Sequence, residues 1–212
     1  MIDQLKLKCN NTGRNNFKQN LEYIKDLVLY NKDKKIDMSK LNEEEKKAEE
    51  AVKKEKETNL TWFINYILTK RISGPQQHNL HHIYIDLIRQ LGHKDSISKT
   101  IEIAVQILQR CLLIDETEYN KVSNKVGGTA QQASQVTQYM RTLGSFLGSL
   151  TLAHNRPIRT QELDLKQLLI QGFYSTAKNR KNVITFVCHI LREAAKKSLV
   201  FKPNNPWMNS IM

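Results

Sequence analysis

Histidine is the residue type in this chain best suited to chemistry, because imidazole binds zinc and exchanges protons near neutral pH. His78, His81, His82 and His93 gather around the expected start of one helix. A zinc site needs at least two such ligands plus further ones at defined spacing, and no cysteine stands nearby. We therefore interpret these histidines as surface and helix-end side chains, and we expect no metal and no other cofactor.

The remaining ionisable side chains do not form a catalytic arrangement either. Glu162 and Asp164 precede an expected helix, where carboxylates stabilise the N-terminus. The motifs GxxxxGK[ST], GxGxxG and HExxH are absent, and the pair Gly127-Gly128 is too weak a signal for a phosphate-binding loop. No nucleophile stands in a usable context with a base. The sequence predicts that the chain is not an enzyme.

The three cysteines indicate reduced thiols. Cys9, Cys111 and Cys188 are odd in number and have no CxxC spacing. Cys111 and Cys188 fall in apolar helical contexts, so we expect both to be buried and reduced, as in a reducing compartment. No stretch has the roughly 20 apolar residues of a membrane span, and the N-terminus lacks the apolar core of a signal peptide. The chain is expected to be soluble and intracellular.

A formal net charge of +12 implies an acidic partner, either nucleic acid or protein. Much of the excess lies between Arg156 and Lys202, and Lys178, Arg180 and Lys181 are expected to cluster in one loop between two helices. Binding of RNA through its phosphates remains open. The patch shows no interleaved exposed aromatic residues for base stacking, whereas docking of an acidic protein needs only the charge.

Apolar residues at helical spacing predict an all-α chain. We expect helices at about 17–30, 41–68, 80–91, 96–112, 136–150, 165–169 and 183–200. Residues 41–57 form a solvated, charged helix that leads into an apolar stripe. Helix pairs recur roughly every 40 residues, as in HEAT-like arrays whose pairs bury their inner faces by stacking on their neighbours. The expected architecture is an α-solenoid of stacked antiparallel helix pairs.

Residues 80–91 give the cleanest amphipathic pattern, and the residues of its apolar face are Leu80, Ile83, Tyr84, Leu87, Ile88 and Leu91. Ser96 is expected to cap the helix that follows. Residues 114–132 have no sustained apolar period and are predicted to be a long exposed loop.

Two glycines at GxxxG spacing, Gly144 and Gly148, lie one turn apart on one face of the expected central helix. A neighbouring helix can approach closely there. Each glycine costs about 1 kcal/mol of helix propensity relative to alanine, so close packing must compensate. The pair is typical of a structural scaffold.

Several segments resemble one protein family. The stretch LGSFLGSLTLAHNRPIRTQELDLKQLL and the closing SLVFKPNNPWMNSIM are similar to the scaffold (Not-one) subunit of the CCR-NOT mRNA deadenylation complex. TWFINYILTKRIS and LHHIY resemble the same family in the same order, so the match covers about residues 46–212. The similar region is the central domain of that scaffold, which resembles the middle domain of translation initiation factor four-G.

The resemblance implies a non-catalytic scaffold. It would tether the Caf/Pop-type deadenylase on one face and dock a DEAD-box ATPase on another, for mRNA deadenylation, decay and translational repression. Other CCR-NOT subunits would bind elsewhere on the scaffold. The alternative is a basic helical-repeat RNA-binding module related to initiation factors. The implied localisation is cytoplasmic, including P-bodies, and nuclear.

The LHHIY helix matches a family segment that we expect to contribute to the deadenylase-binding face. Its candidate residues, chosen as exposed, are His81, His82, Asp86 and Arg89. The candidates for the ATPase or RNA, chosen by charge and exposure, are Arg156, Lys178, Arg180 and Lys181.

The expected domains are an N-terminal extension with one helix at 1–37 and a helical-repeat scaffold domain at 38–212. The final residues look like the start of a further helix, and more helix follows this point in the family. The chain is therefore expected to be a C-terminally truncated piece of a longer scaffold.

Overall fold

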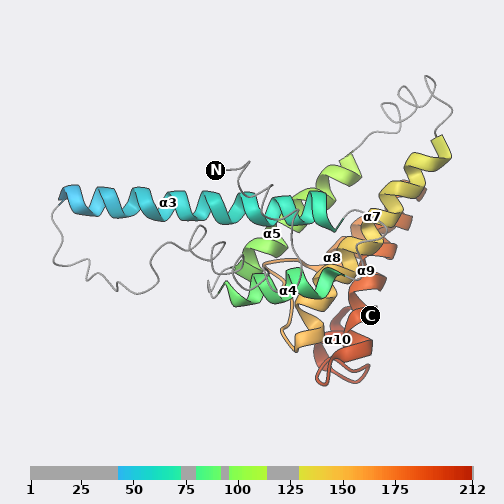
Figure 1. The fold of residues 1–212 in the computed structure, drawn as a ribbon. Helices are drawn as coiled ribbons and strands as arrows, with labels where there is room; N and C mark the ends of the chain where they lie inside the picture. Colours follow the sequence, from blue (N-terminus) through green and yellow to red (C-terminus); the bar gives the residue numbers. More distant parts are fainter. Residues whose placement is uncertain (1–42, 73–79, 92–95, 114–128, 212) are drawn as a thin grey trace.

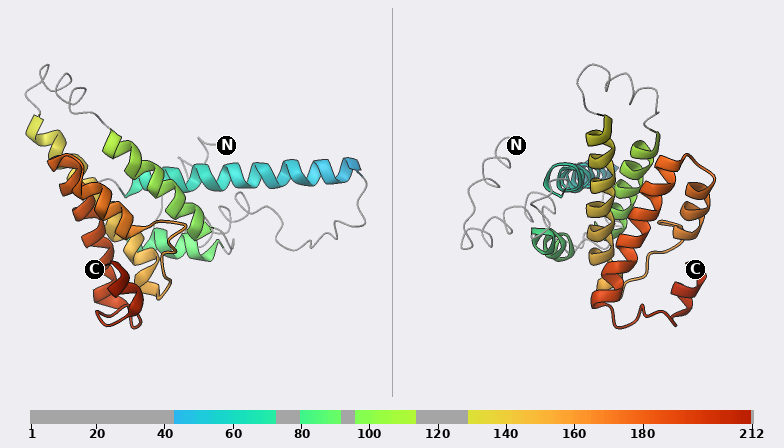
Figure 2. Two further views of the ribbon diagram at one scale, coloured as in Figure 1. Left: turned by 180° about the vertical axis from the view of Figure 1, so that it is seen from behind. Right: turned by 90° about the vertical axis from the view of Figure 1, so that its right-hand side faces the viewer.

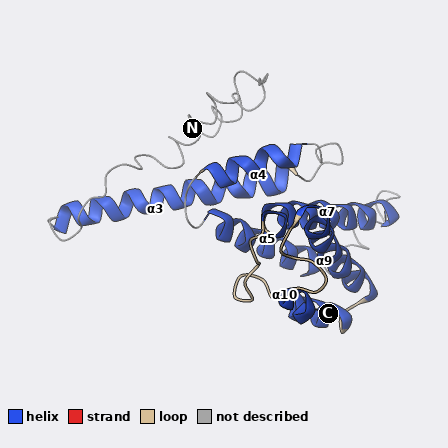
Figure 3. Ribbon diagram, turned by 90° about the horizontal axis from the view of Figure 1, so that it is seen from below, coloured by secondary structure: helices blue, strands red, loops and turns tan. Residues whose placement is uncertain are grey.

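The computed structural model describes residues 43–72, 80–91, 96–113 and 129–211. Within these ranges it is built of helices and connecting turns, without strands (Figure 3). The predicted all-α class is confirmed. The helix expected at 17–30 and most of the loop expected at 114–132 lie outside the described residues.

The described elements are helices that follow one another along the chain. They are α3 (Glu43–Tyr66), the π-helical η2 (Ile67–Arg71), α4 (His81–Gln90), α5 (Ser96–Leu113), α7 (Thr129–Leu150), the 3-10 turn η4 (Leu152–His154), α8 (Leu165–Phe173), α9 (Ala177–Lys197) and α10 (Pro206–Ile211). The last of these confirms that the chain's final residues form helix.

The helix α3 has a projecting half and a packed half. Its N-terminal half extends beyond the other helices (Figure 1), as its charged sequence predicts. Its C-terminal end carries the expected apolar stripe, and every member is buried: Leu60, Phe63, Ile64, Ile67 and Leu68. The half-buried hydroxyl of Tyr139 in α7 donates to the carbonyl oxygen of Leu68 at 2.9 Å. This bond ties the end of α3 and η2 to the central helix.

The helices α7 and α9 form the centre of the fold and run in the same direction. Gly144 faces the backbone of Phe186, and Gly148 faces the backbone of Ile190. A Cβ atom at Gly148 would lie 2.5 Å from the carbonyl oxygen of Ile190. The expected close approach of a neighbouring helix at the glycine pair is confirmed, and that helix is α9.

Consecutive helices pack as pairs around this centre. Because α8 follows α7 in the chain and precedes the parallel α9, it runs in the opposite direction to both. It packs on α9, where Gly172 near its end lies against Val183. α5 packs against α7 and lies behind α7 and α9 in the right-hand view of Figure 2. Its first turn reaches Glu162, and its last turn receives a hydrogen bond from Asn179 to Leu112. This layered arrangement agrees with the predicted solenoid-like stacking.

The buried face of α4 agrees with the predicted one only in part. Leu87, Ile88 and Leu91 are buried as predicted. Ile85, which lies outside the predicted stripe, is also buried, whereas Leu80 is 41% exposed and Ile83 is only partly covered. The segment has apolar residues on more than half of its circumference, so periodicity alone left two orientations open. Packing against α7 selects the face that contains Ile85.

The starts of two helices and the role of one expected N-cap differ from the sequence predictions. The helix α9 begins at Ala177, with Thr176 as its N-cap accepting from the amide of Asn179. α7 begins at Thr129, inside the expected loop. Ser96 is already helical, and its buried hydroxyl donates to the carbonyl oxygen of Ile88 instead of capping α5.

The segment between η4 and α8 is irregular but fixed at both ends. Asn155 adopts a left-handed conformation with φ 59° after η4. Asp164 is the N-cap of α8 and accepts from the amide of Gln167, as its position before the helix predicts. Trp207 of α10 donates from its indole nitrogen to the carbonyl oxygen of Ile158. Among the described helices, none is long and apolar enough to cross a membrane.

Candidate partner-binding surfaces

The first candidate surface is the outer side of α4. His82, Asp86 and Arg89 are exposed and recur at spacings of four and three residues, which places them in one row along the helix. The row offers an imidazole, a carboxylate and a guanidinium within about two turns. It can therefore hydrogen-bond both donors and acceptors of a protein partner.

His81 does not belong to this row, and its prediction as an exposed candidate is wrong. Its side chain is only 6% exposed, and its ring meets that of Phe146 edge to face at 5.6 Å. The physical reason is the rotated face of α4: His81 shares a stripe with Ile85 and Ile88, both of which are buried. His81 is a packing residue at the interface of α4 with α7.

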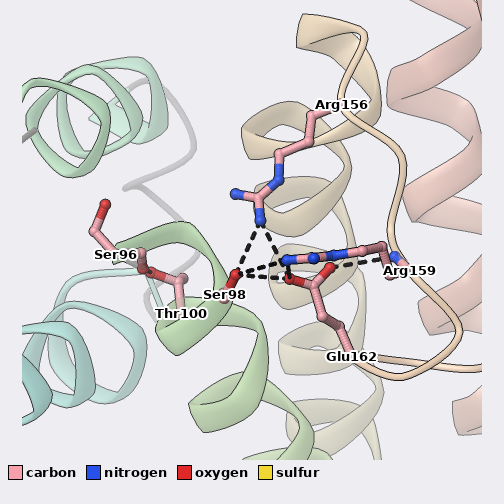
Figure 4. Close-up of polar contacts among 6 residues, drawn as sticks. All are labelled: Ser96, Ser98, Thr100, Arg156, Arg159 and Glu162. Atoms are coloured by element: carbon pink, nitrogen blue, oxygen red, sulfur yellow. Dashed lines mark hydrogen bonds and ion pairs between the residues drawn. The ribbon is translucent and has the colours of Figure 1, made fainter. Parts of the chain in front are cut away.

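The second candidate surface surrounds Arg156 in the segment before α8. Arg156 and Arg159 both donate from Nη2 to Oε1 of Glu162, at 3.2 and 3.1 Å. Ser98 in the first turn of α5 donates its hydroxyl to the same oxygen at 2.7 Å and accepts from Arg156 at 3.0 Å (Figure 4). We call Ser98, Arg156, Arg159 and Glu162 the arginine cluster. It locks the segment before α8 onto α5.

The carboxyl of Glu162 is held in its ionised form. Partial burial by itself would raise its pKa. Hydrogen bonds from Ser98 and Arg159, together with the charge of Arg156, outweigh burial and lower the pKa below its ordinary value. Its carboxylate neutralises one of the two arginines, and the side chain of Arg159 is 63% exposed against 25% for Arg156. Arg159 is therefore the cation that a partner meets first.

The third candidate surface lies where α8 ends and α9 begins. Lys178, Arg180 and Lys181 are in the first turns of α9, so their prediction as a loop is wrong. Lys178 is half-buried and its ammonium nitrogen is buried, so its charge is not presented at the surface. Arg180 and Lys181 are exposed.

Arg180 is fixed beside an exposed aromatic side chain. Its guanidinium lies 5.2 Å from the ring centroid of Phe173, and its Nη2 donates to the carbonyl oxygen of the same residue at 2.9 Å. Phe173 and the next residue, Tyr174, are 61% and 83% exposed. We call Phe173, Tyr174, Arg180 and Lys181 the aromatic corner.

The structure separates the basic candidates into two sites. Ser98 of the arginine cluster lies in the first turn of α5, whereas Leu112 at the other end of α5 accepts a hydrogen bond from Asn179 beside the aromatic corner. Fourteen helical residues separate Ser98 from Leu112, which corresponds to roughly 20 Å. The two sites can therefore contact different partners.

Sequence reasoning missed Ser98, Arg159, Phe173 and Tyr174. Arg159 stands three residues before Glu162, which is a recognisable short-range ion-pair spacing. Nothing local in the sequence indicates that Ser98 meets this pair, because the contact spans 64 residues. Phe173 and Tyr174 directly follow an apolar helix, and nothing local in the sequence indicates that both rings are exposed.

The described residues show no metal or thiol chemistry. They contain no group of three or more His, Cys, Asp or Glu side chains that could hold a metal ion. Burial raises the pKa of the Cys111 thiol, as expected for an inert packing residue. Cys188 is exposed, so its prediction as a buried thiol is wrong.

Comparison with known proteins identifies related sequences. A family model described as the CCR4-NOT transcription complex subunit 1 CAF1-binding domain matches residues 34–212. The General negative regulator of transcription subunit 1 of Schizosaccharomyces pombe is 32% identical over 153 residues, which cover 72% of this chain and 6% of that protein.

Two further relatives agree with this match. The CCR4-NOT transcription complex subunit let-711 of Caenorhabditis elegans is 28% identical over 71% of the chain and 5% of its own length. The General negative regulator of transcription subunit 1 of Saccharomyces cerevisiae is 27% identical over 72% of the chain and 6% of its own length. The chain thus spans a small fraction of these relatives. The names of these relatives describe subunits, and the family model describes a binding domain, which agrees with the prediction that the chain is not an enzyme.

Proposed function

The chain belongs to the family of CCR4-NOT transcription complex subunit 1 CAF1-binding domains, and from this membership we propose that it is a scaffold segment that holds a CAF1-type deadenylase. The match over residues 34–212 is the observation that carries the proposal. It agrees with the resemblance found in the sequence to the scaffold subunit of the deadenylation complex. The similarity to the middle domain of initiation factor four-G stays a prediction.

In this proposal the chain acts by tethering. A nuclease bound to a rigid helical surface is kept at high effective concentration near any mRNA that the rest of the complex holds. The buried and continuous core of α5, α7 and α9 supports such a role, because it fixes the outer faces of the helices relative to one another. The chemistry on poly(A) belongs to the bound enzyme.

We assign the deadenylase to the outer row of α4, made of His82, Asp86 and Arg89. Reversing the charge of Arg89 tests the assignment. Arg89→Glu is expected to weaken binding of a CAF1-type deadenylase about tenfold or more, because a charge that faces a partner acts on both affinity and association rate. The measurement is isothermal titration of the purified chain with the enzyme.

A matched control is available on the neighbouring helix. Arg110 is also an exposed arginine in the last turn of its helix, α5. Arg110→Glu should leave the affinity unchanged. If both variants bind like the unmodified chain, α4 does not form the deadenylase face.

We further propose that a DEAD-box ATPase of mRNA decay and translational repression docks at the arginine cluster. The support is one exposed guanidinium, that of Arg159, held in place by Glu162 and adjacent to α5. Titrations of the purified chain with the ATPase and with the deadenylase decide this point. Arg159→Glu should weaken binding of the ATPase and leave binding of the deadenylase unchanged. Arg89→Glu should weaken binding of the deadenylase and leave binding of the ATPase unchanged. Loss of both partners in either variant would contradict two separate faces.

A further inference from the structure

We propose that the aromatic corner binds single-stranded RNA, with Phe173 and Tyr174 stacking on bases and with Arg180 and Lys181 contacting phosphates. This inference goes beyond deadenylase binding and does not depend on it. It also revises the sequence interpretation, in which the basic patch had no exposed aromatic residues beside it.

The first argument is the exposure of two neighbouring rings. Phe173 and Tyr174 are 61% and 83% exposed, and their rings meet edge to face at 5.3 Å with an angle of 86°. Large aromatic side chains usually contribute their area to a core or an interface. Because every base has a flat face, exposed rings bind single-stranded RNA with little dependence on sequence.

The second argument is the charge around the rings. The sequence from Leu165 to Arg192 contains five lysines and arginines and no aspartate or glutamate. Two of the five cations, Arg180 and Lys181, are exposed at the corner itself. Since α9 begins there, the positive end of its helix dipole adds to the same field. The corner therefore attracts an anion.

The third argument is the placement of Arg180. Its guanidinium is held over the ring of Phe173 at 5.2 Å by a hydrogen bond to the backbone carbonyl of that residue. The guanidinium that would contact a phosphate and the ring that would stack on a base are thus held next to each other before RNA binds. Single-stranded RNA repeats this combination of base and phosphate at every nucleotide.

An acidic amphipathic helix of a partner protein is the competing occupant. Such a helix would anchor on aliphatic side chains, and the exposed ones in the two helices that form the corner are Ile170 of α8 and Ile184 of α9. Both are roughly half covered, at 43% and 47% exposed, and each lies about one turn or more from the rings along its own helix. Within α8, α9 and the turn between them, the most exposed apolar side chains are the two rings, which favours RNA.

The test is fluorescence anisotropy of labelled oligoadenylate and oligouridylate with the full chain across a salt series. Tyr174→Ala is expected to weaken binding of both by roughly 5- to 100-fold, and Tyr174→Phe to preserve it, because stacking needs the ring and not the hydroxyl. Lys181→Gln should lower the slope of log affinity against log salt by about 0.7, the value for one lost contact to a single strand.

Lys197→Gln is the matched control, since Lys197 is an exposed lysine in the last turn of the same helix. It should leave affinity unchanged. Equal effects of the two lysine variants, with none for Tyr174→Ala, would show attraction to net charge alone and would overturn the proposal. So would an absence of binding at low salt, or binding of an acidic helical peptide that is lost in Ile170→Ala or Ile184→Ala. Titrating the same variants with the CAF1-type deadenylase distinguishes a failure of the RNA proposal from a failure of the proposed deadenylase binding.

Discussion

Asn155 holds two distant parts of the chain together at the end of the central helix. Its left-handed backbone, with φ 59°, is one that asparagine adopts more readily than most residues. Its side-chain oxygen accepts hydrogen bonds from the hydroxyl of Ser198 and from the amides of Leu199 and Val200. The residue therefore ends α7 and η4 and receives the chain as it leaves α9.

Glu162 gives the fold a dependence on pH. Its folded-state pKa is lowered relative to the unfolded chain, so its contribution to stability is complete above the unfolded value of about 4.3 and is lost as the pH falls through the folded value. Glu162→Gln should lower the free energy of unfolding by about 1–2 kcal/mol at pH 7. Urea melts at pH 7 and at stepwise lower pH should show this difference shrinking.

The control for Glu162 is Glu102, whose side chain is 52% exposed in its ion pair with Lys99. Glu102→Gln should change stability by only a few tenths of a kcal/mol at any pH, about the value of an exposed helical pair. A difference for Glu162→Gln that stays constant from pH 7 to pH 3 would contradict the role assigned to its charge.

At the scale of elements, the interface of α7 with α9 sets the geometry of the molecule. Gly144 and Gly148 let the two backbones approach, and three side-chain pairs fix their register. These pairs are Thr137–Asn182 at 2.9 Å, Ser145–His189 at 3.1 Å and Ser149–Glu193 at 3.4 Å. Because the partners advance together along both helices, the same pairs also establish that α7 and α9 are parallel.

Gly148→Ala tests this interface. The added Cβ would lie 2.5 Å from the carbonyl oxygen and 2.9 Å from the Cα of Ile190, and backbone atoms cannot move aside at low cost. The free energy of unfolding should fall by about 2 kcal/mol or more, although alanine improves helix propensity by about 1 kcal/mol. Thermal or urea unfolding measures it. Arg141→Ala, at an exposed position of α7, is the control and should be nearly neutral.

The elements also show what the sequence can and cannot predict. The helices with one clear apolar stripe, such as the end of α3, were predicted together with their buried residues. In α4 the helix and part of its buried face were predicted, but the burial of Ile85 was not, because Ile83 and Ile85 compete for the core and only packing decides between them. The start of α9 was missed because its first turn is polar, and its N-cap Thr176 was not recognised.

At the scale of the whole molecule, the fold is a framework with three outer faces. The α4 row and the aromatic corner lie on or at the ends of helices whose inner sides belong to one continuous core, and the arginine cluster lies in the segment before α8, which Ser98 ties to α5. The sequence indicated that basic residues between 156 and 202 matter. It could not separate the arginine cluster from the aromatic corner, because that division depends on contacts of α5 with segments 58 to 67 residues away.

Titration of the purified chain with a purified CAF1-type deadenylase tests the central claim most directly. The account predicts a saturable 1:1 complex that forms without RNA, that persists with an inactive nuclease, and that is weakened by Arg89→Glu but not by Arg110→Glu. No detectable association at micromolar concentrations, with the chain shown to be folded, would contradict it.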